Sequence, residues 1–223
     1  MSENIAETRQ RARRALKTLQ KSYPKAKIAL RYNNNIQLLA AVILSAQCTD
    51  KKVNEVTATL FKKYRTVNDF ADAQPRVFEQ EIRQTGFYRA KTRNIIAAAK
   101  MLRRDFGGKV PKTMAEMLRL PGVARKTANV VLGNAYGIVE GIAVDTHVRR
   151  LAQRLGFSRN EDPVKIERDL MALFPKSQWF SLTYTLIEHG RAICKAPTPK
   201  CEVCPVAKSC PTGIKRLGLK GTA

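Results

Sequence analysis

Four of the five cysteines in this chain lie within a stretch of seventeen residues. They are Cys194, Cys201, Cys204 and Cys210, separated by six, two and five residues. Thiols at this density indicate a metal centre or a set of disulfides, and either would fix the path of the loop that carries them. Structural zinc sites usually have two short-spaced ligand pairs, whereas here one Cys-x2-Cys pair has a single cysteine on each side. Such a loop can wrap a cubane iron–sulfur cluster, and the spacing alone leaves zinc as the alternative.

The chain is strongly basic. Its 223 residues include 41 Lys and Arg against 18 Asp and Glu, which gives a formal net charge of +23. This imbalance favours a polyanionic partner, either nucleic acid or an acidic membrane surface, because solubility alone needs far less charge. The most apolar stretch, Ile36 to Ala46, covers eleven residues and is too short to cross a bilayer. We therefore expect nucleic acid.

The cellular compartment bears on the interpretation of the cysteines. The sequence Met1-Ser-Glu-Asn-Ile lacks the basic and then apolar layout of a signal peptide. The expected location is the cytoplasm, with association to the nucleoid if the source is bacterial. In that reducing compartment clustered cysteines bind metal more often than they form disulfides, so a metal centre is the favoured interpretation.

Apolar residues recur at helical spacing along the chain, and no segment shows the alternation typical of a strand. Asp50 and Asp145 are each expected to cap a helix, because a carboxylate there can accept hydrogen bonds from the first free backbone N–H groups. The last helix is expected to run from about Ser177 towards Cys194. These patterns predict an all-α fold.

The segment Leu120-Pro-Gly-Val-Ala-Arg-Lys-Thr-Ala128 predicts a turn between two helices. A Pro-Gly pair breaks the first helix, and Gly122 can adopt the positive φ that such a turn requires. Backbone N–H groups around Val123, Ala124 and Arg125 then point outward, with the positive end of the new helix dipole behind them. They form an anion site, and in so basic a chain the expected anion is a DNA phosphate. An ordinary helix–turn–helix connection is the alternative.

Lys126 falls in the first turn of the new helix, where a cation opposes the helix dipole. It is either a phosphate-binding lysine or a nucleophilic amine, whose neutral form the helix end and partial desolvation would favour. Asp145 precedes a later helix and has a capping role in any case. A carboxylate there can also stabilise a positively charged sugar in a transition state, or help to activate the nucleophile, if it lies near Lys126.

Three motifs follow one another along the chain: Leu120-Pro-Gly-Val-Ala-Arg-Lys-Thr-Ala-Asn-Val-Val131, Val144-Asp-Thr-His-Val-x-Arg150 and Cys-x6-Cys-x2-Cys-x5-Cys. Together with Leu44-Ser-Ala-Gln-Cys-Thr-Asp50 they resemble the endonuclease III family of the helix–hairpin–helix superfamily. The resemblance covers nearly the whole chain. It implies two helical lobes with a DNA-binding cleft between them. One would be a six-helix lobe with the hairpin, and the other would carry the iron–sulfur loop; the expected ranges are 28–138, and 1–27 plus 139–223.

The resemblance also implies a bifunctional DNA glycosylase and AP lyase of base excision repair, with Lys126 as nucleophile and Asp145 as catalytic carboxylate. The amine would attack C1′ of a nucleotide, expel an oxidised pyrimidine and form a Schiff base. Elimination of the 3′ phosphate would then nick the strand. The expected partner is double-stranded DNA with damaged bases or abasic sites, bound by a monomer.

Further expectations follow from the matched motifs. The base must leave the stack, and Gln47 matches the residue that is inserted into the duplex in its place. Phe87 falls near a second wedge, with a core aromatic at a helix end as the alternative. The four cysteines would hold a 4Fe–4S cluster in preference to zinc. Lysines near the cysteines would hold the cysteine loop against DNA phosphates, with plain solubility as their alternative role (Lys195, Lys200 and Lys208). Cys48 is expected to be a small buried thiol.

Three rival functions stay open at this point. An adenine-specific mismatch glycosylase would lack the lysine and carry a further C-terminal domain, and thymine-specific mismatch relatives commonly replace the lysine. A non-enzymatic iron–sulfur DNA-binding protein would need neither Lys126 nor Asp145. One departure from the family pattern is Ala124, which stands where the hairpin often has a second glycine. A negative φ at Ala124 would keep the hairpin geometry.

Overall fold

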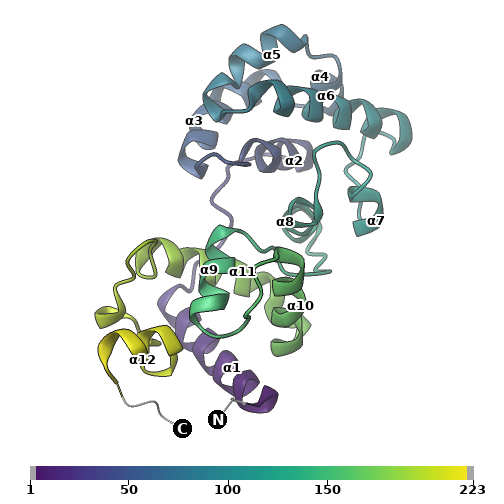
Figure 1. The fold of residues 1–223 in the computed structure, drawn as a ribbon. Helices are drawn as coiled ribbons and strands as arrows, with labels where there is room; N and C mark the ends of the chain where they lie inside the picture. The colour runs from purple at the N-terminus through teal and green to yellow at the C-terminus, as the bar shows by residue number, and fades with distance from the viewer. Residues whose placement is uncertain (1–3, 220–223) are drawn as a thin grey trace. The chain divides into compact units, whose positions relative to one another are not determined.

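The structure is a computed structural model and describes residues 4–219. Twelve α-helices and three short 3₁₀ helices, with no strand, make up the regular structure of this range (Figure 1). The expected all-α fold is confirmed. The chain divides into two compact units, Ala29–Glu140 and Met1–Ile28 with Gly141–Ala223. We call them the hairpin unit and the cysteine unit. No helix in residues 4–219 is long and apolar enough to cross a membrane.

The hairpin unit is built around one mostly apolar helix, α2. Every residue of α2 from Ile36 to Leu44 is buried, as expected of a helix covered on all sides. It contacts α3, α6 and α8. Its neighbours bury one face each and expose most of their charged residues, with Lys91 of α6 as a buried exception. The helices of this unit are α2 (Asn35–Leu44), α3 (Asp50–Lys63), α4 (Val67–Ala71), α5 (Pro75–Glu81), η1 (Arg83–Thr85), α6 (Tyr88–Asp105), α7 (Met114–Met117) and α8 (Arg125–Tyr136).

The cysteine unit joins the two ends of the chain. Helix α1 buries Leu16 and Leu19 in a core that also holds Leu151, Leu170 and Leu186. Its helix contacts are with α10 and α11, and α9 packs on α11. The helices of this unit are α1 (Ile5–Ser22), α9 (Thr146–Arg154), α10 (Pro163–Leu173), α11 (Lys176–Ala192), η2 (Cys201–Val203), η3 (Ala207–Ser209) and α12 (Pro211–Leu217).

Two local expectations were wrong. The cap of α3 is Thr49, whose side chain accepts from Lys52 N at 3.3 Å, and Asp50 is the first helical residue instead. Threonine caps a helix nearly as well as aspartate, and Asp50 in the first turn still favours the helix dipole. Helix α11 is not the last helix, because α12 follows the cysteine loop and begins with Pro211 at its first position.

Candidate functional site

The turn before α8 has the geometry of a helix-connecting hairpin. Gly122 has φ 78°, and Ala124 precedes the helix with φ −93° and ψ 171°. The expected negative φ at Ala124 is confirmed, so alanine fits without strain. Glycine is required at position 122 for two reasons. The positive φ disfavours any other residue, and a Cβ there would lie 2.7 Å from the Cβ of Asn94 on α6. Close packing on α6 therefore fixes the path of the turn.

The start of α8 offers backbone donors to a ligand. Ala124 has no side chain that could cap the helix, and no side-chain cap bond is present there. The first helical bond runs from Ala128 N to Ala124 O at 3.0 Å, so the helix itself gives no acceptor to the N–H groups before Ala128. The N–H group of Val123 is not one of the outward-pointing donors that were expected, because it donates to Leu120 O at 3.1 Å. The positive end of the helix dipole lies at the same place. The arrangement suits a phosphate oxygen.

Lys126 is the second residue of α8, and its side chain is exposed. The opposite face of the helix buries Ala128, Val131 and Leu132, and α8 packs on α2. This packing anchors the helix while its first turn faces solvent. The partial desolvation expected for the amine is absent from the free protein and would have to come from bound DNA.

Asp145 caps α9, as expected. Its Oδ1 accepts a hydrogen bond from Val148 N at 2.8 Å, and the residue is half-buried. The cap uses one of the two carboxylate oxygens. Asp145 belongs to the cysteine unit and Lys126 to the hairpin unit, so their joint role stays a prediction.

Gln47 and Phe87 share an unusual backbone conformation. Their φ angles are 51° and 48°, the positive values among the non-glycine residues of the described chain. Both side chains are exposed, and Phe87 has 64% of its surface open to solvent. The alternative of a core aromatic at Phe87 is therefore wrong. Left-handed backbone at residues other than glycine is costly and tends to occur at functional sites.

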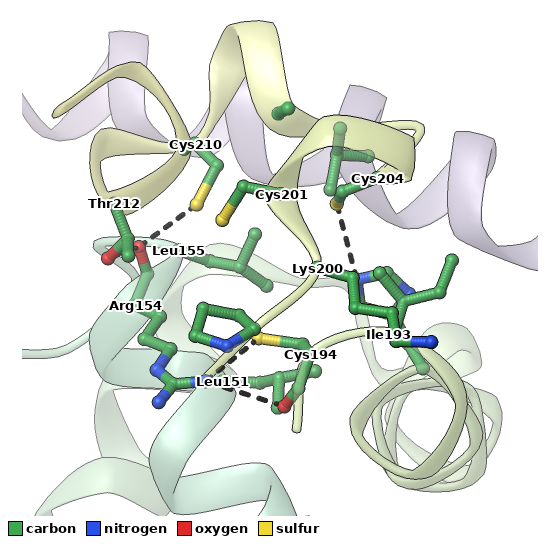
Figure 2. Close-up of a pocket in the computed structure, with 15 residues that line it drawn as sticks. Leu151, Arg154, Leu155, Ile193, Cys194, Lys200, Cys201, Cys204, Cys210 and Thr212 are labelled. Atoms are coloured by element: carbon green, nitrogen blue, oxygen red, sulfur yellow. Dashed lines mark hydrogen bonds between the residues drawn. The ribbon is translucent and has the colours of Figure 1, made fainter. Parts of the chain in front are cut away.

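The four clustered cysteines line one pocket of the cysteine unit (Figure 2). Cys201 and Cys210 are buried, and Cys194 and Cys204 are half-buried. Burial raises the pKa of Cys204 to about 11, with the neighbouring thiols acting in the same direction, and burial also raises the pKa of Cys210. Cys204 and Cys210 would therefore need a bound cation to lose their protons and become thiolates. The remaining lining is mostly apolar and includes Leu151, Leu155, Ile193, Val206 and Ala207.

Two nitrogen groups lie beside the sulfurs. Arg154 Nη1 donates to Cys194 Sγ at 3.4 Å, and His189 Nε2 lies 3.5 Å from Cys204 Sγ. Burial lowers the pKa of His189 to about 4, so the imidazole is neutral at pH 7. Tyr23 Oη lies 3.2 Å from its other ring nitrogen, Nδ1. When the hydroxyl donates to Nδ1, Nε2–H is left to face the sulfur.

The donor set fits an iron–sulfur cluster in its chemistry. The described lining residues supply four thiols and no carboxylate, and hydrogen bonds to sulfur are typical of cluster sites. Within residues 4–219, no three His, Cys, Asp or Glu side chains are arranged to hold a single metal ion. Cys48 lies outside this pocket and is half-buried, whereas it was expected to be buried.

Comparisons with known proteins bring these features together. Residues 40–176 match the HhH-GPD superfamily of base excision DNA repair proteins. Endonuclease III of Synechocystis sp. is 49% identical over 93% of this chain and 95% of its own length. Endonuclease III of Bacillus subtilis is 46% identical over 87% of this chain and 89% of its own. The chain belongs to the endonuclease III family.

Solved structures of the endonuclease III family have the same fold. A non-covalent endonuclease III–DNA complex matches with a TM-score of 0.90 and 44% identity, covering 94% of this chain and 98% of that chain. A trapped endonuclease III–DNA covalent intermediate matches with a TM-score of 0.89 and the same identity and coverage. A thermostable thymine-DNA glycosylase is 21% identical with a TM-score of 0.83, which shows a shared fold.

In this member of the endonuclease III family, α9 also holds the cysteine loop, which the sequence analysis missed. Arg154 donates to the carbonyl oxygens of Lys195 at 2.8 Å and Pro197 at 3.0 Å, and Arg150 donates to that of Cys194 at 3.2 Å. Arg150 ends the Val-Asp-Thr-His-Val-x-Arg motif, so a signal was present. The helix capped by Asp145 is thereby joined to the loop. The loop lysines are exposed (Lys195, Lys200 and Lys208).

Proposed function

We propose that this protein is a base-excision-repair DNA glycosylase with AP lyase activity that acts on oxidised pyrimidines in double-stranded DNA. The observation that carries the proposal is the position of Lys126. An exposed amine stands one residue inside a helix that begins without a side-chain cap, and such a helix start suits a phosphate. A related endonuclease III, 44% identical, has been trapped covalently on DNA. A covalent intermediate requires a nucleophile, and Lys126 is the residue that this chain offers at the matched motif.

In the proposed reaction the hairpin holds the DNA backbone and Lys126 forms the covalent bond. The Nζ atom attacks C1′, the bond from C1′ to the base breaks, and a Schiff base results. Elimination of the 3′ phosphate then nicks the strand. The bound duplex excludes water from the first turn of α8. The hairpin binds phosphate without reading sequence, so damage is selected by how readily a base leaves the stack.

Asp145 has a second role in the proposed mechanism. Its Oδ1 is fixed by the cap bond to Val148 N, which orients the carboxylate. The negative charge then stabilises the positively charged sugar as the base departs. A carboxylate already held in place needs no reorganisation during the reaction. This role requires the two units to act as lobes on one DNA duplex.

We also propose that Cys194, Cys201, Cys204 and Cys210 hold a 4Fe–4S cluster. When bound, the cluster cross-links the loop between α11 and α12 and supplies positive charge to thiols that burial keeps protonated. It takes no part in bond breaking. Chemical analysis tests this assignment: four iron and four sulfide per chain support it, and zinc without sulfide contradicts it.

A substrate panel tests the function. The wild-type protein is incubated with matched duplexes that contain an oxidised pyrimidine, an abasic site, an A·G mismatch or a T·G mismatch. We expect base release and strand nicking with the oxidised-pyrimidine duplex, and strand nicking with the abasic duplex. Activity confined to either mismatch would support a mismatch glycosylase instead, and binding without any bond cleavage would support a non-enzymatic DNA-binding protein.

A further inference from the structure

The hairpin unit contains a buried lysine that the proposed mechanism does not use. Lys91 on α6 has 4% of its surface exposed. Its ammonium donates two hydrogen bonds to main-chain carbonyl oxygens, to Leu44 O at 2.8 Å and to Thr85 O at 2.7 Å. Lysine is almost never this buried unless it is paired, because removing the charge from water is costly. The burial lowers the pKa of Lys91.

The two carbonyl groups mark the beginnings of two exposed loops. Leu44 is the last residue of α2 and Thr85 the last residue of η1. Carbonyl groups at the end of a helix lack a helical partner, and a cation is favourable there. Gln47 follows Leu44 by three residues, and Phe87 follows Thr85 by two. One nitrogen atom therefore fixes the start of both loops that carry the left-handed residues.

One further side-chain bond joins the two regions, and a backbone bond anchors the second loop to α6. Lys52 Nζ, just beyond the first loop, donates to Gln84 Oε1 in η1 at 3.2 Å. On the other side, Lys91 N donates to Phe87 O at 3.0 Å in the first turn of α6. Left-handed backbone at Gln47 and Phe87 persists only where the surrounding structure over-determines it. The buried ammonium is the element common to both loops.

We propose that Lys91 is a positioning residue that holds the two loops in register, so that Gln47 and Phe87 enter the DNA duplex as one preorganised pair. The proposal rests on the proposed function, because it assumes that these two side chains fill the space left by a displaced base. Preorganised side chains lose less conformational freedom on binding, so more of the binding free energy is available to open the stack. Lys91 itself touches no DNA in this account.

A double-mutant cycle tests the proposal. Lys91→Met keeps the length of the side chain and removes its donors, and Lys100→Met, at an exposed position of the same helix, is the control for the lost charge. Base release is measured in single turnover, in the wild-type background and in the Gln47→Ala/Phe87→Ala background. We expect Lys91→Met to slow base release about 10- to 100-fold in the wild-type background. In the Gln47→Ala/Phe87→Ala background, Lys91→Met should slow base release by no more than about twofold. The affinity for undamaged duplex should be the same with and without Lys91→Met in both backgrounds.

Two results would overturn the proposal: no loss from Lys91→Met, or an equal loss in both backgrounds, which would indicate a general structural role. A second readout separates this failure from failure of the proposed function. Fluorescence of 2-aminopurine placed opposite an abasic analogue reports insertion into the duplex and needs no bond cleavage. A wild type that raises the fluorescence but releases no base would refute the proposed function alone. Equal fluorescence with wild type and Lys91→Met would refute the positioning role alone.

If Lys91→Met does not fold, a second variant and a measurement on the wild-type protein still test the proposal. Lys91→Gln keeps two N–H donors on a shorter arm and goes through the same cycle. The wild-type protein gives an independent measurement, amide hydrogen exchange in the absence of DNA. We expect slow exchange at residues 45–48 and 85–88, because the loops are fixed before DNA binds. Exchange at the rate of an unstructured loop in both segments would contradict the proposal.

Discussion

The carboxylate of Asp145 accepts a hydrogen bond from Val148 N at 2.8 Å, so the residue proposed to stabilise the sugar cation also begins α9. The same helix ends at Arg154, whose guanidinium holds the cysteine loop. The proposed catalytic carboxylate and the cysteine loop are thus attached to opposite ends of one nine-residue helix. Through this helix, the proposed cluster would support the proposed active site without taking part in bond breaking.

Asp145→Asn separates the two roles of this side chain. Asparagine caps a helix as well as aspartate does, so thermal stability should change little. The negative charge is lost, and we expect base release to slow by about 100-fold or more. Asp145→Ala should in addition lose about 1 kcal/mol of unfolding free energy with the cap. Thermal unfolding and single-turnover kinetics check both variants, and an Asp145→Asn protein as fast as wild type would refute the catalytic role.

Gly122→Ala should damage the hairpin. The substitution places a side chain at φ 78° and a Cβ 2.7 Å from the Cβ of Asn94. We expect a loss of about 1–3 kcal/mol in unfolding free energy and weaker binding to undamaged duplex. Gly137→Ala is the matched control, since its φ is 67° but no atom lies within 4 Å of the added carbon. If both variants lose the same stability and both bind DNA normally, the contact with Asn94 has no role.

DNA binding should depend steeply on salt. Phosphate contacts release counterions, so affinity falls about 10³- to 10⁵-fold between 50 and 200 mM salt when six to ten phosphates are neutralised. The net charge of +23 supports contacts of that number. Titrations of an undamaged duplex at several salt concentrations measure the slope. An affinity independent of salt would contradict electrostatic binding of the DNA backbone.

Arg154→Met should weaken the proposed iron–sulfur site. The arginine donates to Cys194 Sγ and to two carbonyl groups of the loop, and methionine retains only its apolar length. We expect a lower iron and sulfide content and faster loss of the cluster in air. Arg149→Met, at an exposed position of the same helix, should keep the wild-type content. Equal iron content in both variants would show that the hydrogen bonds of Arg154 do not matter for the cluster.

Much of the fold could be predicted from the sequence, because its signals are local. Helical periodicity gives the all-α class, and Pro-Gly followed by a basic helix start gives the hairpin. The Asp145 cap is likewise encoded by neighbouring residues. Thr49 was missed because two adjacent residues can both cap a helix, and aspartate was preferred to threonine. Helix α12 was missed because its seven residues follow a loop that cysteines dominate.

The contacts that hold the candidate site together are non-local, and sequence patterns do not show them. In the sequence, Lys91 is indistinguishable from the surface lysines of a basic chain. In the structure it is buried, and its partners Leu44 and Thr85 lie 47 and 6 residues away along the chain. The left-handed backbone at Gln47 and Phe87 has no local signal either, since glycine is the residue expected there. Only the packing of α2, η1 and α6 brings these residues together.

Borohydride trapping tests the central claim most directly. The protein is mixed with a duplex that carries an oxidised pyrimidine, a Schiff base is reduced to a stable amine, and mass spectrometry locates the adduct. We predict a covalent complex at Lys126 with wild type and with Lys100→Ala, and none with Lys126→Ala. An undiminished adduct in Lys126→Ala, or no adduct with the wild type, would contradict the account.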